Sequence, residues 1–366
     1  MKIAQVAPLV ESVPPRFYGG TERVVHYLTE ELVRQGHDVT LFASGDSLTA
    51  AELVPCGEKA LRSSPQVQDP IPHYMIMLEK VRRRAREFDV IHFHIDCLHF
   101  PLFREMSART VTTLHGRLDL PGLVPLYQEF DDMPLVSISR HQRRPMPDVL
   151  WAGNVYHGLP QDLYAISRPS DGGYVAFLGR ICPEKRVDRA IEMARRAGVK
   201  LRIAAKVDSV DRVYFERKIR PLLSHPLIEY LGEIGEREKG AFLGGAKAVL
   251  FPIDWPEPFG LVMIEAMACG TPVIAYPSGS VPEVVEHGVT GFIVENIDQA
   301  VAALGKLDTL DAGVIRRRFE RRFTVARMAR DYVEIYRALT EPERLPMPAV
   351  GTGLRAGTGV GVGFAD

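Results

Sequence analysis

The fold is decided by the stretch Trp255–Pro272, which reads WPEPFGLVMIEAMACGTP. Its apolar part, rich in alanine and methionine, predicts a helix. Proline cannot lie inside a helix, so the two prolines before Phe259 place the start of the helix near that residue. Gly270, followed by a proline, ends it. A short helix that opens directly after a proline-rich turn is therefore the element from which the rest of the chain is interpreted.

Two carboxylates flank the start of this helix. Glu257 lies in the preceding loop and Glu265 about two turns inside, and the free N–H groups of Phe259, Gly260 and Leu261 point outward between them. Such N–H groups form an anion site. A carboxylate on either side accepts hydrogen bonds from vicinal hydroxyls. The expected ligand is a phosphate between two polyhydroxyl groups, as in a nucleotide sugar.

Composition indicates a soluble globular protein of two α/β domains, with 366 residues, 46% hydrophobic and 25% charged. A net charge of −1 gives no electrostatic case for nucleic acid. The four cysteines lack Cys-x-x-Cys spacing, which favours a reducing compartment over a disulfide or zinc framework. No apolar run is long enough for a membrane span or a signal peptide, so a cytoplasmic location is expected.

In the first half of the chain, apolar runs alternate with helical patterns. Residues 2–7 predict a buried strand, a glycine loop follows, residues 21–35 predict a helix with Thr21 as N-cap, and residues 39–43 predict a second strand. In such a βαβ unit, ligands bind at the loop after the first strand. Residues 56–72 are poorly patterned. A helix is predicted at 73–88, and strands at 90–93, 109–114, 134–139 and 151–157.

A polar, glycine-rich segment at 159–173 predicts a linker, after which the pattern restarts. Strands are predicted at 174–178, 201–205, 228–231, 248–251, 273–275 and 291–294, and helices at 186–196, at 239–244 and from 281. We expect domains at 1–165 and 170–322, a final amphipathic helix at 323–340 and a disordered tail at 341–366. The glycine repeats of the tail are not a dinucleotide fingerprint, because no strand and helix flank them.

Several motifs occur in one order along the chain. The Glu257-x7-Glu265 pair in its Pro-Glu-Pro-Phe-Gly-Leu-Val setting, Gly179-Arg180 with Glu184-Lys185, and Gly19-Gly20 before the first helix together resemble the retaining glycosyltransferases of family 4. The similarity covers residues 1–340. It implies the GT-B architecture, in which two Rossmann-like, doubly wound α/β domains face each other across a cleft and the last helix crosses back to the first domain.

The resemblance gives Arg180 and Lys185 a catalytic role, in which they stabilise the charge on a departing nucleoside diphosphate without a metal ion. Arg180 follows a strand end and Lys185 opens the next helical region, so both can converge on the predicted anion site at Phe259. The other explanation is an exposed pair on a basic helix, since four further arginines lie nearby, at positions 186, 189, 195 and 196.

Three glutamates are assigned to the donor by the same resemblance. Glu265 accepts the ribose hydroxyls, Glu257 lies by the donor sugar, and Glu233 lies in the loop whose backbone recognises the base. A buried carboxylate without a partner is costly, so a salt bridge is the alternative for Glu265. A turn carboxylate is the alternative for Glu257, and an ordinary glycine turn for the loop at Glu233.

Two further positions lie at the same predicted sheet edge. Gly19 and Gly20 let the backbone approach a ligand closely and admit positive φ, and the family places this turn near the donor phosphate and the acceptor. His115 ends a strand where the family often has a histidine that contacts the donor sugar. A plain turn after a strand and a structural histidine are the alternatives.

Two clusters outside these motifs have weaker signals. His92, His94, Asp96 and His99 could hold a metal, but no third ligand at suitable spacing is defined, so we expect an acceptor-side surface at a strand end and no metal site. The basic run KVRRRAR at residues 80–86 could contact anionic lipid, but a solvated helix face is favoured over peripheral membrane contact.

Two departures from the family pattern bear on the pocket. Ala-Ala-Lys206-Val stands where a glycine-rich turn is usual, so Lys206 can supply a side-chain cation. Pro-Ile-Asp-Trp255 stands where small residues are common and could narrow the sugar pocket.

The predicted activity is metal-independent, retaining transfer of a hexosyl group from a UDP-, GDP- or ADP-sugar to a hydroxyl acceptor, with no cofactor besides the donor. No carboxylate nucleophile aligned with a partner acid is evident, which favours front-face displacement, in which the leaving phosphate helps to deprotonate the acceptor. A GT-B phosphorylase, a nucleotide-sugar epimerase and a non-catalytic sugar-nucleotide-binding protein remain alternatives. A nicotinamide dehydrogenase would need a glycine fingerprint after a strand, which the sequence lacks.

Overall fold

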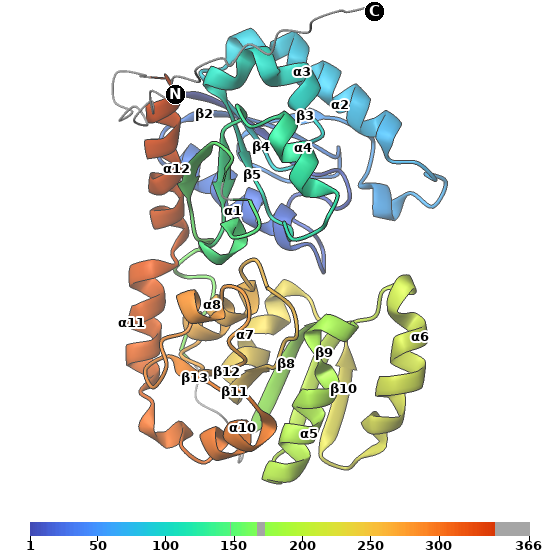
Figure 1. The fold of residues 1–366 in the computed structure, drawn as a ribbon, viewed down its shortest axis with the longest axis vertical. Helices are drawn as coiled ribbons and strands as arrows, with labels where there is room; N and C mark the ends of the chain where they lie inside the picture. Colours follow the sequence, from blue (N-terminus) through green and yellow to red (C-terminus); the bar gives the residue numbers. More distant parts are fainter. Residues whose placement is uncertain (147, 167–172, 341–366) are drawn as a thin grey trace, which may run out of the picture.

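The protein, a computed structural model that describes residues 1–146, 148–166 and 173–340, contains two parallel β-sheets, one in each lobe of Figure 1. The first sheet has the order β3-β2-β1-β4-β5-β6-β7 and the second the order β10-β9-β8-β11-β12-β13. Every pairing between neighbouring strands is parallel. The sequence prediction of two doubly wound α/β domains is confirmed.

The N-terminal sheet is built on β1, whose apolar residues are buried on both faces, as a central parallel strand requires. Its strands are β1 (Lys2–Val6), β2 (Asp38–Ala43), β3 (Glu52–Pro55), β4 (Val90–Phe93), β5 (Thr110–Thr113), β6 (Leu135–Ser137) and β7 (Trp151–Asn154). Its α-helices are α1 (Gly20–Arg34), α2 (Ile71–Arg84), α3 (Phe100–Phe103) and α4 (Leu123–Glu129), with 3₁₀ turns at Leu61–Ser63, Ala85–Glu87, Arg104–Arg109 and His141–Arg143.

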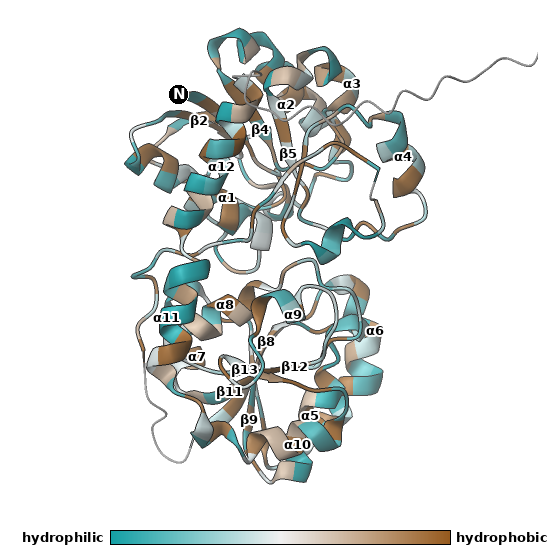
Figure 2. Ribbon diagram, turned by 60° about the vertical axis from the view of Figure 1, so that its left-hand side comes forward, coloured by the Kyte–Doolittle hydropathy of each residue, from teal (hydrophilic) through white to brown (hydrophobic). Residues whose placement is uncertain are grey.

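The C-terminal sheet repeats this plan. Its strands are β8 (Tyr174–Arg180), β9 (Leu201–Lys206), β10 (Ile228–Gly232), β11 (Ala246–Phe251), β12 (Val273–Ala275) and β13 (Gly291–Ile293). Its helices are α5 (Val187–Ala197), α6 (Arg212–Tyr214), α7 (Glu236–Gly244), α8 (Leu261–Ala268), α9 (Val281–Val284), α10 (Ile297–Leu304) and α11 (Ala312–Arg322). A π-helix covers Phe215–Ile219, and 3₁₀ turns cover Pro183–Lys185, Ser209–Asp211, Arg220–Ser224 and Leu307–Thr309. Figure 2 shows apolar residues on the strands and hydrophilic ones on the outer helices.

The last helix, α12 (Val325–Thr340), returns to the N-terminal domain, as predicted. It packs against α1, and its Tyr332 and Tyr336 are fully buried there. The chain passes between the domains where Leu159 bridges Thr324, and a Cβ on Gly158 would lie 2.4 Å from the Thr324 carbonyl oxygen. Only glycine permits two backbone segments to approach this closely.

Several local predictions were wrong. Thr21 lies inside α1 and does not cap it, since the N-cap is Gly19. Strand β3 was missed because its burial is only partial at the sheet edge. The helices α10 and α11 and the helical segment 212–224 were also not predicted. The start of α8 is at Leu261 and not near Phe259, which places Glu265 about one turn inside the helix.

Some expectations concern residues that the structure does not describe. The predicted disorder of 341–366 and its glycine repeats lie outside the described residues, as does part of the predicted linker, at 167–172. Among the residues that are described, no helix has the combination of length and apolar character needed to cross a bilayer.

The basic run at residues 80–86 is largely engaged within its own domain. Arg82 and Arg83 bond to Glu79, Arg84 bonds to Glu52 and Glu87, and the Lys80 ammonium donates to the Pro55 carbonyl at 2.6 Å. These contacts leave fewer cationic groups free than the run of sequence letters suggests.

Candidate active site

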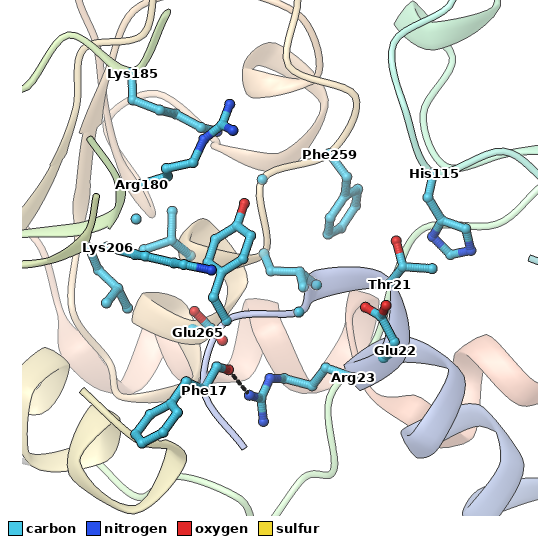
Figure 3. A pocket seen from close by; sticks show the side chains of 18 of the residues that line it. Phe17, Thr21, Glu22, Arg23, His115, Arg180, Lys185, Lys206, Phe259 and Glu265 are labelled. Atoms are coloured by element: carbon cyan, nitrogen blue, oxygen red, sulfur yellow. Dashed lines mark hydrogen bonds between the residues drawn. The ribbon is translucent and has the colours of Figure 1, made fainter. Parts of the chain in front are cut away.

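A cavity of about 430 Å³ lies between the two domains. The N-terminal domain contributes the loop before α1, the first turn of α1 and the end of β5, whereas the C-terminal domain contributes the ends of β8 and β9 and the start of α8 (Figure 3). All the predicted site residues line this one cavity: Gly19, Gly20, His115, Arg180, Lys185, Glu233, Glu257, Phe259, Gly260, Leu261 and Glu265.

The N-terminus of α8 opens into the cavity. Its N-cap, Gly260, has φ 77°, and a Cβ there would lie 2.9 Å from the Met263 methyl and 3.2 Å from the Phe251 ring. The N–H groups of residues 259–262 make no hydrogen bond to any other described residue. Because free N–H groups and the positive end of the helix dipole coincide here, the cavity can bind an anion at this point.

Lys185 follows the end of β8 and is already paired. Its ammonium forms an ion pair with Glu257 and lies 5.1 Å from the centre of the Trp255 ring. The indole Nε1 of Trp255 donates to the same carboxylate at 3.0 Å. An arriving phosphate would therefore have to compete with Glu257 for the Lys185 charge.

Arg180 ends β8 and, like Lys185, lines the cavity (Figure 3). Its guanidinium lies 3.5 Å from Asp208 and 3.7 Å from Asp211. Arg186 and Arg189 instead pair with Asp254 and are not among the cavity residues. The two predicted cations are thus distinguished by position from the neighbouring arginines, which argues against an exposed basic helix face.

Glu265 belongs to a charge network that joins the domains. It is 3% exposed and accepts a hydrogen bond from the Lys239 ammonium at 2.9 Å. Lys239 also lies 3.4 Å from Glu236, which forms an ion pair with Arg23 of α1. Sequence reasoning identified Glu265 but missed Lys239 and Arg23, because spacing along the chain does not show which helices meet. Pairing explains how the carboxylate is tolerated in an apolar helix.

Glu233 meets the N-terminal domain directly. Its carboxylate accepts a hydrogen bond from the backbone N–H of Tyr18 at 3.0 Å. Lys206, which stands where a glycine-rich turn was expected, pairs with Asp208 at 3.0 Å and lies 5.5 Å from the centre of the Tyr18 ring. The loop that carries Tyr18 therefore contacts the C-terminal side of the cavity through these two residues.

Gly19 and Gly20 allow other segments to approach the backbone closely, but neither residue adopts a positive φ. The predicted positive φ was therefore wrong. Gly19 has an extended φ of 160°, and Gly20 is not among the glycines with positive φ. A Cβ on Gly19 would lie 2.7 Å from the Pro15 Cβ, and one on Gly20 would lie 3.7 Å from the side chain of Leu261. The first turn of α1 thus faces the first turn of α8.

His115 lies just beyond β5, and its Nε2 is 2.9 Å from the Nδ1 of His94. Its ring stacks on His157, 5.3 Å away between centres, and His157 contacts Phe259 edge to face at 4.8 Å. Burial lowers the pKa of His115 to about 3, so its imidazole is neutral at physiological pH. A neutral ring has one N–H and one lone pair to offer.

The other histidines correct a prediction. His92, His94 and His99 are buried side chains that do not line the cavity, so they form no acceptor-side surface. They are satisfied within the domain: His92 bonds to Tyr336 and Thr113, and His99 bonds to Thr112. In the described part of the chain, no group of three or more His, Cys, Asp or Glu side chains has the arrangement of a metal site.

Two cavity carboxylates were missed. Glu22 of α1 is 5% exposed, and burial raises the pKa of its carboxyl. Glu11 forms an ion pair with Arg62 at 2.9 Å. In the sequence Glu22 resembles an ordinary exposed residue in the first turn of a helix, so no signal distinguished it. The N-terminal wall of the cavity is therefore rich in hydrogen-bond acceptors.

Models of known protein families match both halves of the chain. The family model described as Glycosyltransferase Family 4 matches residues 18–151, and the one described as Glycosyl transferases group 1 matches residues 163–321. The glycogen synthase of Mycobacterium tuberculosis is 27% identical over 396 aligned positions, which cover 92% of this chain and 95% of the relative.

Two solved structures share the fold. The sucrose-phosphate synthase of Thermosynechococcus elongatus superposes with a TM-score of 0.75 at 18% identity, covering 93% of this chain and 99% of that one. HepE of Anabaena, solved in complex with UDP-glucose, superposes with a TM-score of 0.69 at 18% identity, covering 91% of this chain and 98% of that one.

Proposed function

Because this chain belongs to the family 4 glycosyltransferases, we propose that it moves a hexosyl group from a nucleoside diphosphate sugar to a hydroxyl acceptor bound in the cavity between its domains. The observation that carries the proposal is the convergence of Arg180, Lys185 and the free N-terminus of α8 on one wall of that cavity. Three sources of positive potential that line one cavity match a diphosphate leaving group.

The proposed reaction retains the anomeric configuration. The bond between the anomeric carbon and the β-phosphate oxygen breaks, the acceptor oxygen attacks from the same face, and its proton passes to the departing phosphate. Glu257 is occupied by Lys185 and the Trp255 indole, so it is not a free nucleophile for double displacement. The cations stabilise the charge that develops on the diphosphate, which supports a reaction without a metal ion.

We place the nucleoside on the C-terminal domain. Glu265, one turn inside α8, is suited to accept the ribose hydroxyls, and the loop at Glu233 lies where the base would be held. The presence of UDP-glucose in the similar HepE structure makes the uridine nucleotide the first donor to test. The sugar itself would lie towards His115 and Glu257, and the acceptor towards Glu11 and Glu22.

Donor binding is tested first, by thermal unfolding of the full chain with UDP-, GDP- and ADP-glucose. One nucleotide is expected to raise the midpoint, because a ligand at about 100 times its Kd adds roughly 2.7 kcal/mol to the free energy of unfolding. No shift with any of the three, at concentrations up to millimolar, would contradict a nucleotide-sugar site.

Catalysis is tested with Arg180→Ala and Lys185→Ala, using the donor so identified. Each variant is expected to lose at least about a hundredfold in kcat, since removal of one positioned electrostatic group lowers kcat by about 10²–10³-fold. The midpoint of thermal unfolding should stay within a few degrees of the wild type. Arg189→Ala, which removes a cation paired outside the cavity, is the matched control and keeps its turnover. Wild-type turnover in both cavity variants would refute the mechanism.

Product analysis separates the remaining alternatives. Proton NMR of the glycoside should show the anomeric configuration of the donor, and a chelator should leave the rate unchanged. A requirement for inorganic phosphate would indicate a phosphorylase, an epimerised donor formed without acceptor would indicate an epimerase, and donor binding without transfer or hydrolysis would indicate a binding protein.

A further inference from the structure

A continuous chain of side-chain hydrogen bonds joins helix α12 to the cavity. Its six contacts, in order, are Tyr332 hydroxyl to Thr113 Oγ1 (2.9 Å), Thr113 Oγ1 to His92 Nε2 (2.7 Å), His92 Nδ1 to Tyr336 hydroxyl (2.7 Å), Tyr336 hydroxyl to Gln5 Nε2 (3.2 Å), Gln5 Oε1 to His94 Nε2 (2.8 Å) and His94 Nδ1 to His115 Nε2 (2.9 Å). Apart from the last residue, every member is buried, so water cannot substitute for a missing partner.

Each imidazole in this chain is neutral. Burial lowers the pKa of His92 and His94 well below its usual value and lowers that of His115 to about 3. A neutral imidazole has one N–H donor and one lone pair, so a bond that fixes the role of one nitrogen also fixes the role of the other. Each ring therefore links the donor or acceptor role of its partner on one side to the role required of its partner on the other side.

The amide of Gln5 sets that direction. Its Nε2 donates to the Tyr336 hydroxyl, and its Oε1 accepts from His94 Nε2, which must therefore carry the proton of that ring. The Nδ1 of His94 is then a lone pair, and it can bond to His115 only if the Nε2 of His115 donates. The Nδ1 of His115 is left as a lone pair, and this atom is buried and makes no hydrogen bond to any described residue.

We propose that the Tyr336 hydroxyl and the Gln5 amide are positioning groups that hold His115 in its Nε2–H tautomer and thereby leave its buried Nδ1 as an unpaired acceptor beside the cavity that His115 lines. The crossing helix α12 contributes in this way to the chemistry of a site that it does not touch. An acceptor at this position accepts from a ligand hydroxyl and cannot donate to a phosphate oxygen. That the ligand is the sugar being transferred rests on the proposed function, whereas the tautomer does not.

The tautomer can be measured without donor or acceptor. We would label the histidines of the full chain with ¹⁵N and record two-bond proton–nitrogen correlations at neutral pH, identifying the His115 signals by their loss in His115→Asn. The expected result is a single Nε2–H form for His115 and for His94. A protonated Nδ1 on His115, or a mixture of tautomers in the wild-type protein, would overturn the proposal.

The dependence on α12 is tested with Tyr336→Phe, which deletes one hydroxyl from the chain. His115 should then show both tautomers, because Gln5 Nε2 loses the one acceptor it has among the described residues, and the amide can then exchange the places of its nitrogen and oxygen. Gln5→Met interrupts the chain one step nearer and should have the same effect. Tyr127→Phe, which changes a buried tyrosine of the same domain outside the chain, is the control and should keep the single form. Thermal unfolding would first establish that Tyr336→Phe and Gln5→Met are folded. If the folded variants then kept the single Nε2–H form of His115, Tyr336 and Gln5 would have no positioning role.

Discussion

At the scale of single residues, the charged groups of the cavity are paired with one another before any ligand arrives. Lys185 is held by Glu257, and Lys239 by Glu265. Sequence reasoning treated Lys185, Glu257 and Glu265 as separate ligands for phosphate and for hydroxyls and did not identify Lys239. The structure shows instead that a bound donor must exchange partners with pairs that already exist, so binding gains only the difference between two sets of contacts.

The pair of Glu265 and Lys239 gives a prediction at this scale. Glu265→Leu should lower the free energy of unfolding by about 1–3 kcal/mol, because it removes the nearer of the two carboxylates that pair with the Lys239 ammonium and leaves only Glu236, 3.4 Å away. Urea unfolding measures the loss.

The double variant Glu265→Leu with Lys239→Met is the control, since it removes both charges. It should recover most of the lost stability but not the donor-induced shift in the unfolding midpoint. A double variant as unstable as the single one would show that the cost comes from packing and not from the lost ion pair.

At the scale of elements, α8 is a short helix whose two ends are set by glycine. Gly260 precedes it with φ 77°, and Gly270 follows it with φ 74°. The sequence placed the end correctly, because a glycine followed by a proline is a strong stop signal. It placed the start two residues early, because prolines exclude helix before them but do not show where the first helical residue lies.

Gly260→Ala is the prediction that belongs to this element. The substitution combines a positive φ with contacts of 2.9 Å to Met263 and 3.2 Å to Phe251, so it should cost about 1–3 kcal/mol and turn the first N–H groups of α8 away from the ligand. Thermal unfolding with and without donor measures both effects.

Gly122→Ala provides the comparison. Gly122 precedes α4 with φ −73°, and a Cβ there meets nothing within 4 Å. This variant should match the wild type in stability and in donor binding. If Gly260→Ala bound donor as tightly as Gly122→Ala, the start of α8 would not be the phosphate site.

At the scale of the whole molecule, the cavity exists because two domains are held together around it. Glu283 of α9 in the C-terminal domain accepts hydrogen bonds from three groups of the N-terminal domain: the backbone N–H of Arg140 at 2.8 Å, that of His141 at 2.7 Å and the Tyr156 hydroxyl at 2.8 Å. One carboxylate thus joins the two domains at a second place besides the contact between Glu233 and Tyr18.

Glu283→Ala should therefore favour an open arrangement of the domains. Charge-assisted hydrogen bonds contribute roughly 1.5–3 kcal/mol each, so losing three is expected to raise the KM for the donor and to increase the radius of gyration measured by small-angle scattering. Tyr156→Phe, which removes one of the three bonds, should give a smaller change of the same sign. An unchanged radius and KM in Glu283→Ala would mean that the domains do not need this contact to close.

Much of the candidate site could be predicted from the sequence, because its residues lie in local signals. Strand ends, helix starts and glycine turns are encoded within a few residues, and in a parallel sheet they all face one edge. Local signals placed Arg180, Glu257 and His115 at strand ends and at a helix start, the family resemblance gave them their expected roles, and they line one cavity with the other predicted residues. Their chemical roles remain predictions until the variants above are measured.

The sequence by itself determined the alternation of strands and helices, the two-domain order and the position of α8, since each depends on propensity and periodicity over short distances. Only the tertiary structure decided which charges pair, that His92 and His94 are interior residues and not a surface, and that a tyrosine 221 positions after His115 is joined to it by a chain of hydrogen bonds. The physical reason is that pairing and burial depend on which elements meet in space, and contacts between distant segments leave no periodic trace in a single chain.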